Sequence, residues 1–532
     1  MLDNFASLWE LIADTVGQRV AIVHGERERT WADFDARAAR LASALAGLGV
    51  GPGTTVAVNL RNCIENVEAV FAAFKLRAVP FNVNFRYRER ELGYLLQDAR
   101  PRVIIYDHAF RDRVLPAIER SGLPVHGVEV NGEGPPAGGT LSFEALIAGH
   151  GPAPRVPRSG DDELIIYTGG TTGFPKGVVW AQASALRRPA LRGAPVSTAE
   201  EFNQAVALPD ARAVRLVIAP LMHAAGILST AGTLTAAGTV VFCTSPRLDP
   251  YEVLTLVERH RVTAFSVIGD AIARPLLDAL EEAAANGRPY NLASVETVMN
   301  TGGIWSAPVK KGMLRHGRFT IVDSLSATEA GGFATAEASD PGEIETARFQ
   351  LGPNTRVLND EGKNVVPGSG EIGMLAISGQ LPKGYLNDPE KSAATWPVID
   401  GVRYAMPGDL ATVEPDGTIT LLGRGSEVIN TGGEKVFAEE VETVILSHPA
   451  VGDAIVVGLA DERWGSRVTA VVCVRAGRTL TGPELIDHVG RQLADYKRPR
   501  QVVFADEIPR SPTGKADRPA ARRLAQEATA AS

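Results

Sequence analysis

The chain has 532 residues, more than one hydrophobic core usually supports, which predicts two or more domains. Its apolar share of 45% and charged share of 22% are ordinary for a globular protein and argue against a disordered or fibrous chain. The formal net charge of −8 argues against nucleic acid as a partner, because nucleic-acid-binding proteins usually present a basic face.

The cysteine spacing and the N-terminal segment lead us to expect a cytoplasmic protein. The three cysteines, Cys63, Cys243 and Cys473, are too far apart for a disulfide framework or a metal-ligand cluster, which suits the reducing cytoplasm. The acidic N-terminus lacks the basic cluster of a signal peptide. The uncharged run from Leu216 to Cys243 exceeds the roughly 20 residues of a spanning helix. Its proline and glycines favour a buried strand, loop, helix and strand instead, so we expect no transmembrane segment.

Short apolar runs alternate with helical patterns through most of the chain. The stretch 30–49 begins with Thr30 and Asp33 in a capping pattern, and 249–260 begins with Asp249 as N-cap. This alternation predicts an α/β fold in which helices cover both faces of parallel strands. We expect strands at 54–60, 102–107, 163–168, 214–220, 239–243, 262–269, 295–300 and 320–325.

The pattern changes close to Leu422–Arg424. Beyond this point, predicted helices at 438–449 and 481–496 interleave with predicted strands at 453–460, 467–474 and 500–508. A unit of this length is within the usual size range of a domain. We therefore expect a domain of residues 1–422 followed by a smaller α+β domain of residues 423–532.

The segment from Tyr167 to Gly177, "YTGGTTGFPKG", follows a buried strand and is rich in glycine and threonine. Glycines let backbone N–H groups converge on one anion, threonine hydroxyls add donors, and Lys176 adds positive charge. The spacing is neither that of a Walker A loop, which needs Ser or Thr after the lysine, nor that of a Rossmann turn. A solvated turn is the alternative, but the length of the pattern favours a phosphate-binding loop.

This loop resembles the phosphate loop of the adenylate-forming acyl-CoA synthetases, the AMP-binding enzymes. Further segments resemble the motifs of that family in the same order, so the resemblance covers nearly the whole chain. They are "APLMHAAG" (219–226), "TGGIWSAP" (301–308), "DSLSATEAG" (323–331), "YAMPGDL" (404–410), "GRGSEVINTGGEKVFAEEVE" (423–442), "LADYKRPR" (493–500) and "IPRSPTGKADR" (508–518).

The resemblance implies a large N-terminal domain with stacked mixed sheets and covering helices, plus a small α+β C-terminal domain. It also implies a ligase that uses ATP, Mg²⁺ and coenzyme A. In the first step a carboxylate attacks the α-phosphorus of ATP, giving an acyl-adenylate and pyrophosphate. In the second step the coenzyme A thiol displaces AMP.

The family pattern assigns the phosphate chemistry to three places. Lys515 would bridge the carboxylate and the α-phosphate during adenylation, as the catalytic lysine. Thr328 would donate to the α-phosphate, and Glu329 would be the Mg²⁺ ligand, since this hard cation prefers carboxylate oxygens. The β- and γ-phosphates would be held by Thr168, Gly169, Gly170, Thr171, Thr172, Gly173 and Lys176.

The nucleoside is assigned to a second group of residues. Asp409 would accept hydrogen bonds from the ribose hydroxyls, with Arg424 as a donor nearby. Asp323 would receive the adenine amino group. The base itself would lie beside three residues, Gly302, Gly303 and Leu325.

The acyl group, coenzyme A and the hinge complete the assignment. His223 and Gly226 would lie beside the acyl group, and Gly432 and Gly433 would line the pantetheine tunnel. Ser426 would be the hinge about which the small domain swings between the two steps, bringing Lys515 to the ATP in one of them.

The chain departs from the family pattern at four positions: Gly169 replaces a serine, Leu325 and Ser326 replace Tyr-Gly, and Ser426 replaces a charged hinge residue. None of these departures removes Lys515, Glu329, Asp409 or Arg424. The substrate is expected to be a fatty or other bulky hydrophobic acid. A free-standing enzyme that loads a carrier-protein thiol is the alternative, a non-catalytic ATP-binding relative is a third, and a homodimer is possible.

Overall fold

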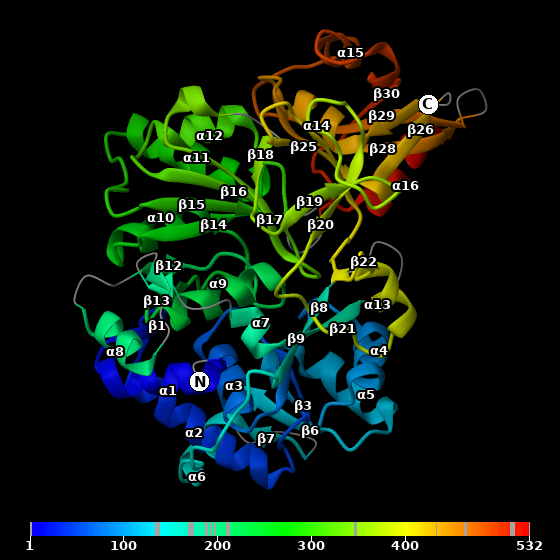
Figure 1. Cartoon of the computed structure of the whole chain (residues 1–532). Helices are drawn as coiled ribbons and strands as arrows, with labels where there is room; N and C mark the ends of the chain where they lie inside the picture. Colours follow the sequence, from blue (N-terminus) through cyan, green and yellow to red (C-terminus); the bar gives the residue numbers. More distant parts are fainter. Residues whose placement is uncertain are drawn as a thin grey trace. The chain divides into compact units, whose positions relative to one another are not determined.

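The structure is a computed structural model that describes residues 3–132, 139–168, 175–186, 190–191, 194–195, 198–208, 213–344, 348–431, 434–461, 465–510 and 516–530. The chain forms two compact units, one of Met1–Phe265 with Gln380–Trp396 and one of Ser266–Gly379 with Pro397–Ser532 (Figure 1). The predicted domain boundary between residues 422 and 423 lies inside the second unit and stays a prediction.

The first unit contains an eight-stranded sheet. Its central strands are parallel, and only β9 pairs antiparallel, with β8 on one side and β21 on the other. The strands in spatial order are β21 (Gly384–Tyr385), β9 (Lys176–Ala181), β8 (Glu163–Thr168), β4 (Val79–Asn82), β3 (Thr55–Asn59), β5 (Val103–Asp107), β6 (His126–Val130) and β7 (Leu141–Ser142).

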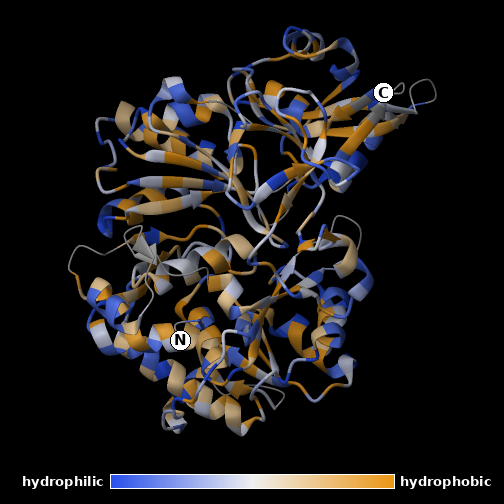
Figure 2. Cartoon of the chain, in the orientation of Figure 1, coloured by the Kyte–Doolittle hydropathy of each residue, from blue (hydrophilic) through white to orange (hydrophobic). Residues whose placement is uncertain are grey.

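Helices cover both faces of this sheet, as the alternation of strands and helices predicts. Val56 and Val58 of β3 pack with α2 (Trp31–Gly47), α3 (Ile64–Lys75) and α6 (Phe143–Gly149) on one face. Ala57, between them, points to the other face and packs with α4 (Glu89–Ala99) and α5 (Arg111–Ser121). The hydrophobic colour along the central strands in Figure 2 reflects this burial on both sides.

Five further strands of the first unit, β1, β2, β12, β13 and β14, form a second, mainly parallel group. Strand β13 (Thr239–Phe242) pairs with β1 (Val20–His24) and β12 (Val214–Leu216), and β12 also pairs with β14 (Ala264–Val267). β2 (Arg27–Thr30) closes this group by pairing antiparallel with β1. Other elements of the unit are α1 (Phe5–Val16), α7 (Gln182–Leu186), β10 (Ala190–Leu191), β11 (Ala194–Pro195), α8 (Ala199–Ala207), α9 (Ala224–Thr235), α10 (Pro250–Arg259) and α13 (Pro389–Thr395).

The uncharged run from Leu216 to Cys243 forms the end of β12, a loop, α9 and then β13, as expected. Within the described ranges no helix is both long and apolar enough to cross a membrane.

The second unit begins with parallel β15 (Thr297–Thr301) and β16 (Thr320–Ala327), followed by antiparallel pairs. Helices α11 (Asp270–Ala285) and α12 (Ala307–Leu314) accompany these strands. The antiparallel strands and ribbons are β17 (Gly331–Ala338), β18 (Arg348–Leu351), β19 (Thr355–Leu358), β20 (Gly373–Ile377), β22 (Val398–Ile399), β23 (Val402–Arg403), β24 (Asp409–Val413) and β25 (Ile419–Arg424).

The last part of the second unit is the predicted α+β arrangement. A hairpin of β26 (Val428–Thr431) and β27 (Glu434–Phe437) precedes α14 (Ala438–Leu446). The sheet of β28 (Val451–Asp461), β29 (Gly465–Val474) and β30 (Gln501–Phe504) packs against α14 and α15 (Gly482–Gly490) on one face and α16 (Arg518–Ala530) on the other. The predicted class, α/β with mixed sheets and an α+β C-terminal region, is confirmed.

Candidate active site

The predicted phosphate loop connects β8 and β9. Thr168 ends β8 and lies directly opposite Lys176, which begins β9 in antiparallel register. The hairpin therefore fixes the two ends of the loop side by side. The loop residues Gly169, Gly170, Thr171, Thr172 and Gly173 lie outside the described residues, as do Gly432, Gly433 and Lys515.

Lys176 has defined partners beside this loop. Its Nζ lies 3.1 Å from Asp388 Oδ2 and 5.2 Å from the centre of the Tyr385 ring. The pKa of Asp388 is lowered, first by the hydrogen bond from the backbone N–H of Lys391 and then by Lys176. The ammonium group is thus held at the loop by a carboxylate and an aromatic face.

Two asparagines position the His223 segment, and sequence reasoning missed both. Asn62 accepts from the backbone N–H of Leu221 at 2.7 Å and donates to the carbonyl of Ala219 at 3.0 Å. Asn82, at the end of β4, donates to the carbonyl of Met222, the residue before His223.

Asn82 also exchanges two hydrogen bonds with the backbone of Tyr167, at 2.8 and 3.0 Å. One amide therefore connects the strand that enters the phosphate loop to the segment that carries His223. A signal was present, since Asn82 ends an apolar strand and Asn62 follows one by three residues, where buried amides commonly satisfy loop backbone groups.

His223 is the N-cap residue of α9, and Gly226 lies in its first turn. A Cβ atom at Gly226 would lie 2.4 Å from the carbonyl oxygen of Pro220. The glycine is thus required by the close approach of α9 to the preceding loop, so its structural role is packing of the segment.

The predicted adenine residues lie together in the second unit. Gly302 has φ +78°, and a Cβ at Gly303 would lie 3.1 Å from the backbone nitrogen of Gly269. Asp323 on β16 is buried and accepts from Asn300 Nδ2 at 2.7 Å. Lys310 of α12 pairs with its other carboxylate oxygen. Asn300 and Lys310 were not predicted.

The departures at Leu325 and Ser326 coincide with a bulge in the pairing of β16 with β17. Leu325 is half-buried at this bulge. The Ser326 hydroxyl lies 3.0 Å from that of Thr301, the residue before Gly302. Ser326 therefore links the end of β15 to the end of β16, which a glycine at this position could not do.

The predicted ribose and metal residues also come together. Asp409 begins β24 and lies directly opposite Arg424 at the end of β25, with 3.4 Å between Oδ1 and Nε. Burial lowers the pKa of Arg424, but the carboxylates of Asp409, Glu329 and Glu427 outweigh burial and the net shift is upward. Arg424 therefore pairs directly with Asp409 and also lies in the field of Glu329 and Glu427.

Glu329 is the residue that fits the expected Mg²⁺. It lies half-buried between β16 and β17, next to Thr328. Magnesium in nucleotide sites is usually held by one or two carboxylates together with substrate phosphates and water, so one carboxylate is sufficient from the protein. Within the described ranges, no three His, Cys, Asp or Glu side chains gather around a possible metal position, so the fit depends on Glu329.

The predicted hinge residue Ser426 lies in the short 3₁₀ turn Gly425–Glu427 that leaves β25. The backbone N–H of Gly425 donates to the carbonyl of Gly408 at 2.9 Å. The turn thus starts directly after the Asp409–Arg424 pair.

The described residues of the second unit can serve three chemical purposes. Asp409 and Arg424 can bind a ribose, Asp323 can accept from an adenine amino group, and Glu329 can hold one divalent cation.

Comparisons with known proteins agree with this arrangement. A sequence model of the AMP-binding enzyme family matches residues 9–386, and one of the AMP-binding enzyme C-terminal domain matches residues 440–515. The chain is 40% identical to a 3-oxocholest-4-en-26-oate–CoA ligase of Rhodococcus rhodochrous, covering 97% of this chain and 94% of the relative. It is 39% identical to the medium-chain acyl-CoA ligase Mig of Mycobacterium avium, covering 95% of each.

Solved structures show the same fold. The anthranilate CoA ligase AuaEII in complex with anthranoyl-AMP superposes with a TM-score of 0.84 at 26% identity, covering 99% of this chain and 98% of that one. ATP-bound MatB of Rhodopseudomonas palustris superposes with a TM-score of 0.80 at 25% identity, covering 99% of each chain. The predicted enzyme class, an AMP-forming acid–thiol ligase, is confirmed. Since the family model matches well over half of its residues, the chain belongs to the AMP-binding enzyme family.

Proposed function

We propose that this enzyme joins a hydrophobic carboxylic acid to coenzyme A at the expense of ATP. A carboxylate oxygen forms a bond to the α-phosphorus while the bond to the β-phosphate breaks, and pyrophosphate leaves. The coenzyme A sulfur then bonds to the acyl carbon, and the bond to AMP breaks.

The observation that carries this proposal is the likeness, over nearly the whole chain, to two ligases that act on hydrophobic acids. One is named for a steroid side-chain acid and the other for medium-chain acids. Neither acts on a carrier protein by name, which favours coenzyme A over the carrier-protein alternative. The acid is thus expected to be apolar and larger than acetate.

The roles of the individual residues belong to this proposal. Asp409 accepts from the ribose hydroxyls while Arg424 balances its charge, and Asp323 accepts from the adenine amino group. Glu329 would hold Mg²⁺, which neutralises phosphate charge when bound, and Thr328 would donate to the α-phosphate. Thr168, Lys176 and the glycine-rich loop between them would bind the departing phosphates.

The proposal also includes the parts that lie outside the described residues. Lys515 would act in adenylation, and Gly432 and Gly433 would line the path of the pantetheine arm. The domains 1–422 and 423–532 would move about Ser426. The intervals matched by the two family models end and begin on either side of this boundary, which supports the division. A cytoplasmic location and a homodimer are further parts of the proposal.

The test is a screen of acids from acetate through medium-chain and long-chain acids to steroid carboxylates, with AMP release measured with and without coenzyme A. We expect release that requires both acid and coenzyme A and a kcat/KM that rises with added carbons, by up to roughly 0.8 kcal/mol per buried methylene. Acetate as the best acid would refute the substrate class. Pyrophosphate release without any response to coenzyme A would favour carrier loading.

A Lys515→Ala variant, measured in the same assays, tests the proposed role of this lysine in adenylation. Loss of one electrostatic stabiliser should slow adenylation by about 10²–10³-fold. Thioester formation from supplied acyl-adenylate should be spared, because the charge that Lys515 offsets arises only in the first step. An equal loss in both steps would contradict the role of Lys515 without refuting the ligase.

A further inference from the structure

We propose that Lys310 and Asn300 are positioning residues for adenine recognition, which hold the Asp323 carboxylate as a fixed acceptor. This inference rests on the proposed function, in which Asp323 accepts a hydrogen bond from the 6-amino group of adenine. It extends the site by two residues that none of the sequence motifs singles out.

The three side chains form a buried cluster. Asn300 on β15 and Asp323 on β16 are partners in parallel register, and Asn300 Nδ2 donates to Asp323 Oδ1 at 2.7 Å. Lys310 Nζ reaches the other oxygen, Oδ2, from α12. The exposed fractions are 5% for Asn300, 3% for Lys310 and 7% for Asp323. Each carboxylate oxygen therefore has one protein donor from a different element.

Asn300 also organises the two turns around the base. Its Nδ2 donates to the carbonyl of Gly303 at 2.9 Å, and its Oδ1 accepts from the backbone N–H of Gly269 at 2.7 Å. Both hydrogens of the amide are used, and so is its oxygen. Gly269 has φ +54°, and a Cβ there would lie 2.3 Å from the carbonyl oxygen of Ile304. One side chain thus ties the carboxylate to the glycine turns expected beside adenine.

The carboxylate retains acceptor capacity for a ligand. Its two oxygens offer about four lone-pair sites, and Asn300 and Lys310 use one on each oxygen. Two donors on different oxygens fix the plane of the group, which aims the remaining lone pairs. Without the lysine, this buried carboxylate would lose its counter-charge and one of its two donors, and an unpaired buried charge is costly. Lys310 therefore holds the Asp323 carboxylate in place.

A purely structural role is the competing explanation for this pair. A buried ion pair, however, generally adds little stability compared with apolar side chains of the same volume. The neighbouring Lys311, on the same helix, is exposed and shows the ordinary position of a helix lysine. The two roles differ in outcome, since a structural pair supports every nucleotide equally, whereas a positioning pair supports the one with a 6-amino group.

The experiment compares ATP with purine riboside triphosphate, in which hydrogen replaces the 6-amino group. Adenylation is followed by pyrophosphate release with the best acid, and both dissociation constants are measured by calorimetry. The native enzyme should prefer ATP by about 10- to 100-fold, the range for a hydrogen bond to a charged group. In Lys310→Met this preference should fall by about tenfold or more. Lys310→Arg should retain it, and Lys311→Met, the matched control, should leave it unchanged.

Failure of the positioning role of Lys310 and failure of the proposed adenylation activity give different results in these measurements. An unchanged preference in Lys310→Met, with both nucleotides weakened equally, would overturn the positioning role. A native enzyme without preference would overturn it as well, by removing the contact to Asp323. If Lys310→Met does not fold, Lys310→Gln, which keeps a donor without the charge, is measured in its place. If no acid is adenylated, the proposed function fails, and the ratio of dissociation constants still decides the role of Lys310.

Discussion

Among the described residues, four charged residues proposed for the site have a partner of opposite charge within their own unit. Asp409 faces Arg424, Asp323 faces Lys310, and Lys176 faces Asp388. Pairing offsets the cost of removing these charges from water and also limits the orientations of the side chains. Restricted side chains lose less freedom when a ligand binds, so each of these pairs is oriented before a nucleotide binds.

At the scale of single residues, a first prediction concerns Glu329. Glu329→Gln should sharply raise the Mg²⁺ concentration needed for half-maximal adenylation, because a neutral amide is a poorer ligand for a hard cation. The measurement is a Mg²⁺ titration of pyrophosphate release at saturating ATP. Glu337→Gln, an acidic residue of β17, serves as the control. A Mg²⁺ titration that Glu329→Gln leaves unchanged would remove Glu329 from the metal site.

The second prediction concerns Glu439 of α14. Burial raises its pKa to about 7, with the charges of Glu442 and Glu427 adding to the shift and Arg518 opposing it. A carboxyl with a raised pKa contributes stability that is complete below its ordinary value of 4.5 and is lost as pH rises to about 7. We expect the melting temperature of the native protein, relative to Glu439→Gln, to fall across this range.

The measurement is a pair of melting curves taken from pH 4.5 to pH 8. Above about pH 7 the Gln variant should be the more stable protein, because it does not place a charge beside two other carboxylates. Parallel curves for the two proteins would show that Glu439 does not titrate in this range.

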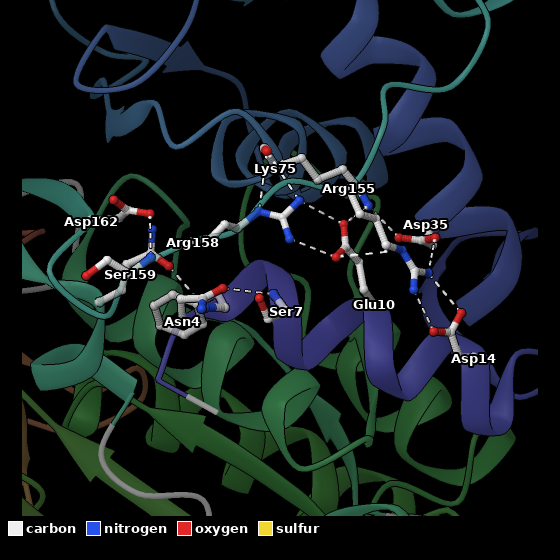
Figure 3. A network of polar contacts seen from close by, with 12 residues as sticks. Asn4, Ser7, Glu10, Asp14, Asp35, Lys75, Arg155, Arg158, Ser159 and Asp162 are labelled. Atoms are coloured by element: carbon white, nitrogen blue, oxygen red, sulfur yellow. Dashed lines mark hydrogen bonds and ion pairs between the residues drawn. The ribbon is translucent and has the colours of Figure 1, made fainter. Parts of the chain in front are cut away.

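At the scale of elements, the chain leading into β8 is held by a buried charge cluster (Figure 3). Arg158 donates to Glu10 of α1 at 2.8 and 3.0 Å and also to the carbonyl of Lys75. Lys75, at the end of α3, pairs with Glu10 at 2.8 Å and with Asp35 of α2 at 2.6 Å. Three helices and the segment that precedes the phosphate hairpin are therefore connected by Glu10 and its partners.

Glu10→Gln should lower the free energy of unfolding by about 3–5 kcal/mol, because it removes the buried carboxylate that Arg158 and Lys75 share and leaves Lys75 with Asp35 alone. Burial raises the pKa of Glu10, but Lys75 and Arg158 outweigh it and the net shift is downward. This contribution is therefore present above pH 4.5 and is lost as pH falls below that value.

Urea unfolding at pH 7 and at acidic pH measures this effect. Glu26→Gln is a matched control, because Glu26 pairs with Arg259 on the surface, where ion pairs are screened by water. The control should unfold as the native protein does. A Glu10→Gln variant as stable as the native protein at pH 7 would show that the cluster does not hold these elements together.

At the scale of the whole molecule, the two reaction steps are proposed to need different domain orientations. Ser426, in the turn after β25, has no charged side chain, so its contribution to a swing must come from backbone freedom. Ser426→Pro fixes φ near −65° and removes a backbone N–H. We expect this variant to keep one half-reaction near the native rate and to lose the other.

Pyrophosphate release and thioester formation from supplied adenylate are the two measurements. Ser426→Ala, which leaves the backbone largely free, should change both by little. If Ser426→Pro kept both half-reactions, the pivot would lie elsewhere, and Gly425 and Arg424 would be the next positions to substitute.

The sequence by itself determined the family, the fold class and most of the strands around the site. The alternation of apolar runs located β8 and β16, and the glycine-rich segments indicated where we propose that the backbone approaches a ligand closely. These features are local, since a strand, a turn or a glycine's freedom depends on neighbouring residues, and so they can be read along the chain. The ordered motifs also singled out Asp323, Asp409 and Arg424, which lie in one unit and which we propose bind the nucleotide.

Only the tertiary structure decided which partners these residues have. Lys310, Asn300, Asn62 and Asn82 carry no motif, and their roles depend on contacts between elements that are distant in the sequence. The hydrogen-bonded residues Asn82 and Tyr167 are 85 positions apart in the sequence. The ion-paired residues Lys75 and Glu10 are 65 positions apart. Burial and pairing set the ionisation and orientation of a side chain, and both arise from packing around it. Local sequence specified which groups are present, and the fold decided which of them act together.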